Sequence, residues 1–202
     1  MITSTGTDVT EGIRKSADRP RTPDQLLGPY FPTGHRPLAQ ADLTAIEGVD
    51  GLAQGEIIEV TGRILNLHGE PVRGVGLTIL QANAFGRYAH SNDTNPAPLD
   101  PHFVGCVDIR SNDEGAYRTK TVKPGAYPAG PDWMRPPHIH FEVHGQFERL
   151  VTQMYFPGEP LNACDRLLNT ALRPDLLVAT SASLGGRPRH HVLNFDIVLT
   201  RG

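Results

Sequence analysis

Apolar residues along the chain fall into short runs that are rich in β-branched and aromatic side chains and are separated by Gly, Pro, Asn and Asp. Runs of this kind, bounded by turn-forming residues, are typical of β-strands. The pattern predicts an all-β sandwich of roughly eight short strands joined by long loops. The expected strands lie at 56–65, 76–84, 104–110, 116–122, 138–145, 148–156 and 191–199.

Turn and helix signals fill the spaces between these strands. The turn SNDEG at 111–115 predicts that the two strands beside it pair as a hairpin. One or two short helices are expected, one at about 162–172 that stops before Pro174 and a shorter helical stretch at 41–48. Two stretches rich in Pro, Gly, Asn and Asp are expected to be long loops, which are often functional: 85–103 and 123–137.

The length of 202 residues is sufficient for one domain with a substantial core. The first part of the chain is polar and rich in turn residues, so we expect residues 1–55 to form an N-terminal arm and loop segment, with residues 1–25 frayed. Residues 56–202 contain all the expected strands. They are predicted to form the β-sandwich domain.

The charge balance excludes some classes of partner. The chain has 19 Lys and Arg against 22 Asp and Glu, a formal net charge of −3, so it lacks the basic surface that nucleic-acid binding requires. No apolar run is long enough for a membrane span or for the core of a signal peptide. Cys106 and Cys164 are too few for a disulfide framework. We therefore expect a cytoplasmic protein with reduced cysteines that binds neither nucleic acid nor membranes.

The sharpest local signal is the sequence His138-Ile139-His140 on a predicted strand. Successive side chains of a strand alternate between faces, so both histidines point to the same side and are spaced to bind one metal ion. The preceding RPP holds the backbone extended and aims the strand. An HxH pair also occurs as ordinary strand histidines. Glu142 and His144 continue the same face, either as partners of the ligands or as solvent-facing residues.

The donors that would complete such a site differ in the metal they favour. A carboxylate would give the triad typical of Fe(II) enzymes. Tyr88 and Tyr127, both in turn-rich loops, offer a different set. Phenolate is a hard anionic donor that matches Fe(III), and a bound cation would lower the phenol pKa far below its usual value. Taken alone, a tyrosine in a turn-rich loop is more often a surface aromatic or one that covers a pocket.

Several stretches together carry a resemblance to the intradiol ring-cleavage dioxygenases. They span residues 60–199 in the order found in that family, with GPYFP at 28–32 as a further match upstream. Within the family, the chain is most similar to the iron-bearing beta subunit of the protocatechuate type. The matching stretches are VTGRILNLHGEPVRGVGLTILQANAFGRY, APLDPHF, TVKPGAYP, RPPHIHFEV, TQMYFPGEP and NFDIVL.

This resemblance implies a nonheme Fe(III) held by the tyrosine of GRY, the tyrosine of the PGAYP loop and both histidines of HIH. In this sequence the ligands are Tyr88, Tyr127, His138 and His140. The resemblance also implies that Tyr127 leaves the metal as a phenol when substrate binds and takes up a substrate proton. Iron then activates the aromatic ring toward O2, and no flavin, nicotinamide or external reductant is needed.

The remaining site residues follow from the same resemblance. Arg135 corresponds to the arginine that stabilises charge on the bound substrate, and Gln153 to a glutamine that lines the pocket. Pro29 and Tyr30 belong to a GPY segment that faces the iron in the family, where a partner subunit supplies it. Since this chain carries both GPY and the four ligands, we expect a homo-oligomer; pairing with a homologous partner subunit is the alternative.

The implied reaction cleaves a small aromatic diol with O2 between its two hydroxylated carbons, which yields a cis,cis-muconate-type diacid. The resemblance favours a protocatechuate-like substrate. The catechol and hydroxyquinol types of the family have a longer helical segment before the sandwich, whereas only about 55 residues precede the first predicted strand here. Hydroxyquinol, catechol and substituted catechols are alternative substrates. A sandwich that binds ligands without catalysis is an alternative of a different class, although such a relative would be expected to lack the ligands that this chain retains.

Overall fold

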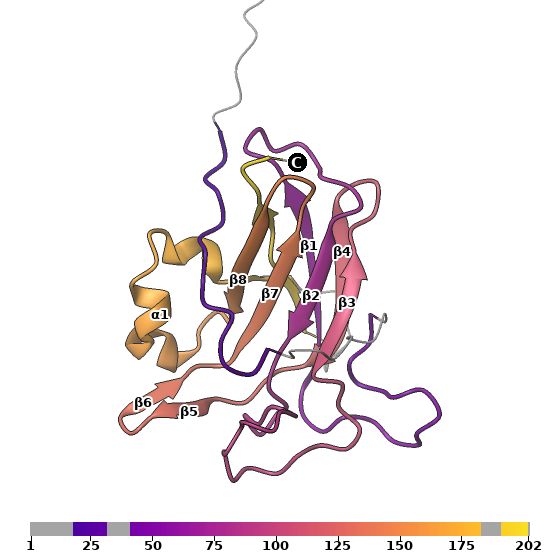
Figure 1. Ribbon diagram of the computed structural model, residues 1–202, viewed down its shortest axis with the longest axis vertical. Coiled ribbons are helices and arrows are strands. Elements are labelled where there is room, and N and C mark those ends of the chain that lie inside the picture. The colour runs from indigo at the N-terminus through magenta and orange to yellow at the C-terminus, as the bar shows by residue number, and fades with distance from the viewer. Residues whose placement is uncertain (1–17, 32–40, 183–190, 202) are drawn as a thin grey trace, which may run out of the picture.

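The computed structural model describes residues 18–31, 41–182 and 191–201, which form two facing β-sheets and a separate hairpin (Figure 1). The first sheet is centred on β1, which pairs antiparallel with β4 on one side and parallel with β10 and β11 on the other. β9 extends this sheet beyond β10. Its strands are β1 (Ile57–Leu65), β4 (Ala116–Val122), β9 (Thr180–Ala182), β10 (His191–Asn194) and β11 (Ile197–Val198).

The second sheet is antiparallel throughout, in the order β3-β2-β7-β8. Its strands are β2 (Gly76–Leu80), β3 (Cys106–Arg110), β7 (His138–His144) and β8 (Arg149–Tyr155). The described chain is thus mostly strand and loop with little helix, and the predicted all-β sandwich is confirmed.

The hydrophobic core lies between the sheets and follows the alternation of the strands. On β1, Ile58, Val60 and Ile64 point inward, and each is almost fully buried. From β7, Ile139 and Phe141 meet them, also fully buried. Apolar side chains at every second position therefore fix which face of each strand points inward.

β7 is buried on its outer face as well as on its inner face, and a stretch of residues 18–31 that we call the N-terminal segment lies over this side of the sheet. The Gln25 N–H donates to Val151 O at 2.7 Å, and Gln153 Nε2 donates to Leu26 O at 2.7 Å. Figure 1 shows this segment in indigo passing beside β8. Residues 18–25 were expected to be frayed, but they are bound to both sheets. Gln25 bonds to β8, and Thr22 exchanges two hydrogen bonds with Val198 of β11. Residues 1–17 lie outside the described part of the chain.

The expected hairpin of β3 and β4 is wrong. β3 pairs with β2 and β4 pairs with β1, so the intervening turn crosses from one sheet to the other. Ser111 Oγ accepts a hydrogen bond from Val75 N and donates to Val72 O, which ties the crossing to the β2 side. Turn residues mark a reversal of the chain, but only side-chain packing decides which strand becomes the neighbour.

The helical expectations also change. Residues 41–48 form bends rather than a helix, because their backbone pairs with β4 through Leu43 N to Lys120 O and Lys120 N to Ala41 O. The helix expected at 162–172 is divided at Asp165, whose extended backbone separates two short pieces. The two pieces are a 3-10 helix, η1 (Pro160–Cys164), and one turn of α-helix, α1 (Arg166–Asn169). A second 3-10 helix, η2 (Pro174–Leu177), follows them.

The stretch at 123–137 is not all loop. It contains a two-stranded hairpin, β5 (Tyr127–Gly130) paired with β6 (Trp133–Arg135), which extends from the end of the second sheet in Figure 1. None of the described helices is long and apolar enough to cross a membrane.

Candidate metal centre and substrate site

Cross-strand pairing brings most of the predicted site residues together. In an antiparallel pair, residues directly opposite each other have side chains on the same face. Three such pairs lie at one end of the second sheet, one in the hairpin and two between β7 and β8. They are Tyr127 with Arg135, His138 with Tyr155, and His140 with Gln153.

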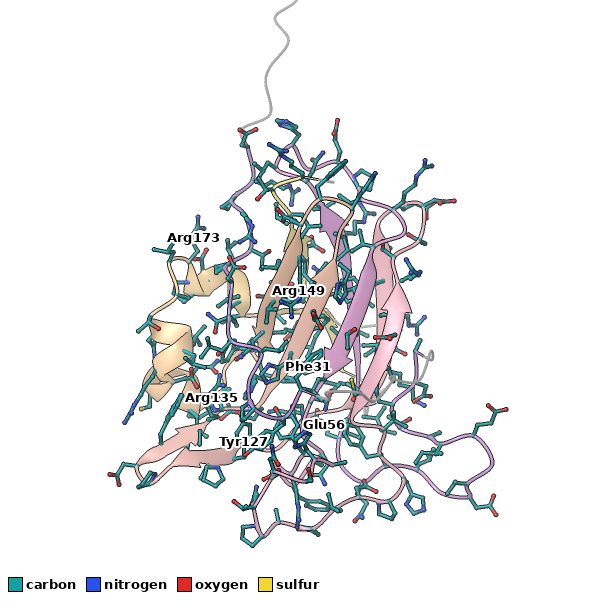
Figure 2. The ribbon with its side chains drawn as sticks, in the orientation of Figure 1. Phe31, Glu56, Tyr127, Arg135, Arg149 and Arg173 are labelled. Carbon is teal, nitrogen blue, oxygen red and sulfur yellow. The ribbon has the colours of Figure 1, made fainter. Side chains whose placement is uncertain are left out.

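The four predicted metal ligands converge in this region. Tyr127 Oη lies 3.4 Å from His138 Nε2, which lies 3.2 Å from His140 Nε2. The Tyr88 ring lies edge-on to Tyr127, with 5.4 Å between the ring centroids, and 6.3 Å from His140. All four side chains are buried. Figure 2 shows Tyr127 beside Arg135 at this end of the sheet.

His138 is held in the tautomer that binds metals through Nε2, and both histidines are neutral. His138 Nδ1 lies 2.7 Å from the Pro136 carbonyl, which can only accept, so Nδ1 carries the proton and the Nε2 lone pair faces the cluster. Burial lowers the pKa of His138 well below its usual value, helped by the neighbouring charges of His140 and Arg135. Burial, with Arg135, lowers the pKa of His140 to about 3. Both imidazoles are therefore neutral at neutral pH.

The tyrosines supply two buried oxygen donors to the cluster. Burial raises the pKa of both phenols, most strongly that of Tyr88. Within the described residues, the Tyr88 hydroxyl is one of six buried side-chain polar atoms that have no hydrogen-bond partner of normal geometry. Leaving a buried polar group in this state costs about 1–3 kcal/mol, a cost that a cation bound by this oxygen would offset. Two phenol oxygens and two imidazole nitrogens suit a hard trivalent cation such as Fe(III).

The loops that carry the two tyrosines are joined through one amide residue, Asn83. Its backbone carbonyl accepts from Gly86 N at 3.0 Å and from Gly125 N at 2.9 Å. Its side-chain oxygen accepts from Phe85 N and Arg87 N. The loops approach so closely that a Cβ on Gly86, at φ +79°, would lie 2.2 Å from the Ala126 carbonyl oxygen. The positions of Tyr88 and Tyr127 are therefore set by one shared network.

Arg135 lies beside the donors in a buried network of its own. Its Nε donates to Asp165 Oδ2 at 2.7 Å, and its Nη2 donates to Gln153 Oε1 at 2.8 Å and Tyr155 Oη at 2.7 Å. The guanidinium charge lowers the pKa of Tyr127 against the larger effect of burial. Arg135 and Gln153 are thus placed beside the predicted ligands.

Sequence reasoning missed two members of this network, Tyr155 and Asp165. Tyr155 lies two residues after Gln153 on β8 and therefore on the same face, a signal that strand alternation offered. Asp165 stands directly before the helical residues RLLN, as an N-cap residue does. Its contact with Arg135, 30 positions away, has no sequence signal.

The N-terminal segment covers the donors from the outside. The Tyr30 ring lies over Tyr88, with centroids 4.7 Å apart and planes inclined by 31°, and 6.3 Å from Tyr127. A Cβ on Gly28 would lie 3.4 Å from His140 Cε1. Pro29 stands between Gly28 and Tyr30 in an exposed turn. Of the GPY residues, Tyr30 makes the aromatic contacts with the predicted ligands.

The family can now be assigned. The sequence model of the dioxygenase family matches residues 26–201, which is most of the chain. The chain belongs to this dioxygenase family. The expected resemblance to intradiol ring-cleavage dioxygenases is thereby confirmed, and so is the expectation that the protein is an enzyme.

Individual relatives of this dioxygenase agree with the assignment. The protocatechuate 3,4-dioxygenase beta chain of Burkholderia cepacia is 42% identical over 95% of this chain and 87% of its own length. The alpha chain from the same organism is 30% identical over 88% and 91%. The solved dioxygenase domain of a carbohydrate-binding fusion protein from Streptomyces sp. SirexAA-E has a TM-score of 0.69 and 28% identity, over 91% of this chain and all of that one.

Proposed function

We propose that this dioxygenase cleaves a protocatechuate-like aromatic diol with O2 between its two hydroxylated carbons, using a nonheme Fe(III) ion. The ligands would be Tyr88, Tyr127, His138 and His140. One observation carries the proposal: two phenols and two neutral imidazoles meet in a buried cluster in which the Tyr88 hydroxyl has no hydrogen-bond partner of normal geometry among the described residues. The 42% identity to a protocatechuate 3,4-dioxygenase beta chain supports the substrate class.

When bound, a ferric ion would supply the Lewis acidity and redox capacity that make a diol reactive toward O2. The chain's own residues handle the proton. Tyr127 stands at the edge of the hairpin opposite Arg135, and its oxygen lies among the imidazoles. Because burial raises its pKa, a free Tyr127 oxygen readily takes a proton. We therefore assign to Tyr127 the acceptance of a proton from the incoming diol.

Arg135 and Gln153 would orient the substrate and stabilise its charge. A buried guanidinium beside the oxygens of a deprotonated diol is a preorganised positive charge, which is most effective where water is excluded. Gln153 is fully buried, and its amide bonds to both Arg135 and the Leu26 carbonyl, so neither side chain has to reorganise. Tyr30 would close the pocket over the ring of the substrate.

The position of Tyr30 bears on assembly. The chain supplies Tyr30 to its own donor cluster, 4.7 Å from Tyr88. We therefore propose that copies of this chain form complete sites without a second kind of subunit, as a homo-oligomer. The existence of homologous alpha and beta chains among the relatives makes a mixed assembly the competing arrangement. Activity of the chain produced alone, with its mass in solution, decides between them.

A substrate panel tests the reaction itself. The purified chain, loaded with iron, should be red-brown and should consume O2 with protocatechuate, with a ring-opened diacid as the product by mass spectrometry. Faster turnover of hydroxyquinol or catechol would move the substrate to the class of the more distant relatives, such as the hydroxyquinol 1,2-dioxygenase of Rhizobium sp., which is 28% identical over 67% of this chain. A colourless, iron-loaded protein without O2 uptake would contradict the proposal.

A further inference from the structure

Asp165 is a fully buried carboxylate whose two oxygens have different partners. Oδ1 accepts hydrogen bonds of 2.8 Å from the backbone N–H groups of Leu167 and Leu168, which caps α1. Oδ2 accepts a hydrogen bond of 2.7 Å from Arg135 Nε. The residue therefore links a helix beside β8 to the guanidinium at the predicted metal centre.

The hydrogen bonds of Arg135 show that Asp165 binds the Nε side of the guanidinium. The three described bonds of the guanidinium use Nε and Nη2, and none of them uses Nη1. Cross-strand pairing in the hairpin places Arg135 directly opposite Tyr127. Asp165 thus holds the Nε side of the guanidinium, while Nη2 bonds to Gln153 and Tyr155 of β8.

We propose that Asp165 is the positioning residue of Arg135 in ring cleavage: it fixes the Nε edge so that the guanidinium keeps facing Tyr127 and the bound diol. The inference rests on the proposed function. Without this anchor, the long side chain of Arg135 would turn toward whichever negative oxygen is nearest in the pocket. The positive charge would then be misplaced when charge develops on the substrate.

The Asp165→Asn variant separates this role from helix capping. Asn is as good an N-cap residue as Asp, so its oxygen still accepts from Leu167 and Leu168. The amide nitrogen of the asparagine then faces Arg135 Nε. Both groups are hydrogen-bond donors, so the bond that anchors Arg135 is lost. Asp175→Asn is the matched control, because Asp175 forms an exposed ion pair with Arg173 in the neighbouring η2.

The test is a double-mutant cycle with Arg135→Met, which removes the guanidinium at similar volume. Steady-state kinetics should show kcat reduced about tenfold or more in Asp165→Asn, with KM changed less than about threefold. The double variant should match Arg135→Met alone within about twofold, because Asp165 acts only through Arg135. In the iron-free proteins, the losses in urea midpoint of the single variants should not add in the double variant.

Other results would overturn the inference. Wild-type kcat in Asp165→Asn would show that Arg135 needs no anchor, and an equal loss in Asp175→Asn would show a general effect of charge. If Asp165→Asn does not fold, the double variant is compared with Arg135→Met instead, because neither of these two variants contains an unpaired buried guanidinium. A kcat in the double variant that is a further tenfold below that of Arg135→Met would contradict the proposal. A wild-type chain inactive on every diol would instead overturn the proposed function, and this inference with it.

Discussion

The two faces of β7 show how one strand serves two purposes. On the inner face, Ile139 and Phe141 pack in an apolar core between the sheets. On the outer face, His138 and His140 are equally buried but lie among phenols, an amide and a guanidinium. The inner face gains stability from apolar burial, whereas the outer face keeps buried polar groups that cost stability unless they bind something. The comparison predicts opposite consequences for substitutions on the two faces.

The largest expected effect is on the polar face. Tyr88→Phe removes one oxygen from the proposed ligand set, so iron content and visible colour should fall to near zero after reconstitution. The iron-free variant should be as stable as the wild type or more stable by up to about 1–3 kcal/mol, because the lost hydroxyl is buried without a hydrogen-bond partner of normal geometry. Metal analysis and urea unfolding of the apoprotein measure the two effects. Full colour in the variant would show that Tyr88 is not a ligand.

On the apolar face, Phe141→Ala should show the reverse pattern. Removing a fully buried aromatic ring leaves a cavity and should destabilise the protein by about 3–5 kcal/mol, measured by urea unfolding. Because Phe141 points away from the donors, the fraction that remains folded at low temperature should bind iron as the wild type does. His140→Ala, one residue away on the other face, is the matched comparison. If both variants lost iron to the same extent, the two faces would not be independent.

The smallest effect concerns the two cysteines, which report on the boundary of the site. Cys106 packs near Tyr88 and Tyr127, and burial, with the charges of Asp108 and Glu142, raises the pKa of its thiol to about 12. At pH 8 it is protonated in the folded protein, and it should react with iodoacetamide only on unfolding. Cys164 is exposed and should react at once. Mass mapping of the alkylated protein checks this, and rapid labelling of Cys106 would indicate an open site.

Much of the fold and of the candidate site could be predicted from residue type and from spacing along single strands. Strand alternation placed His138 and His140 on one face, and the apolar runs gave the sandwich its strands. The resemblance named Tyr88, Tyr127, Arg135 and Gln153, and the structure brings these residues together. The sequence failed where backbone groups found distant partners, as at 41–48, which pairs with β4, and at the supposed hairpin of β3 and β4.

The sequence by itself determined which residues face the core and which types of donor are available, because both depend on residue type and on spacing along one strand. Only the tertiary structure decided that Asp165 divides a helix and holds Arg135, that Asn83 joins the two tyrosine loops, and that Tyr30 lies over Tyr88. Each of these contacts joins segments far apart in the chain or in separate loops. Their free energy depends on desolvation and exact distance, which appear only when the sheets are packed.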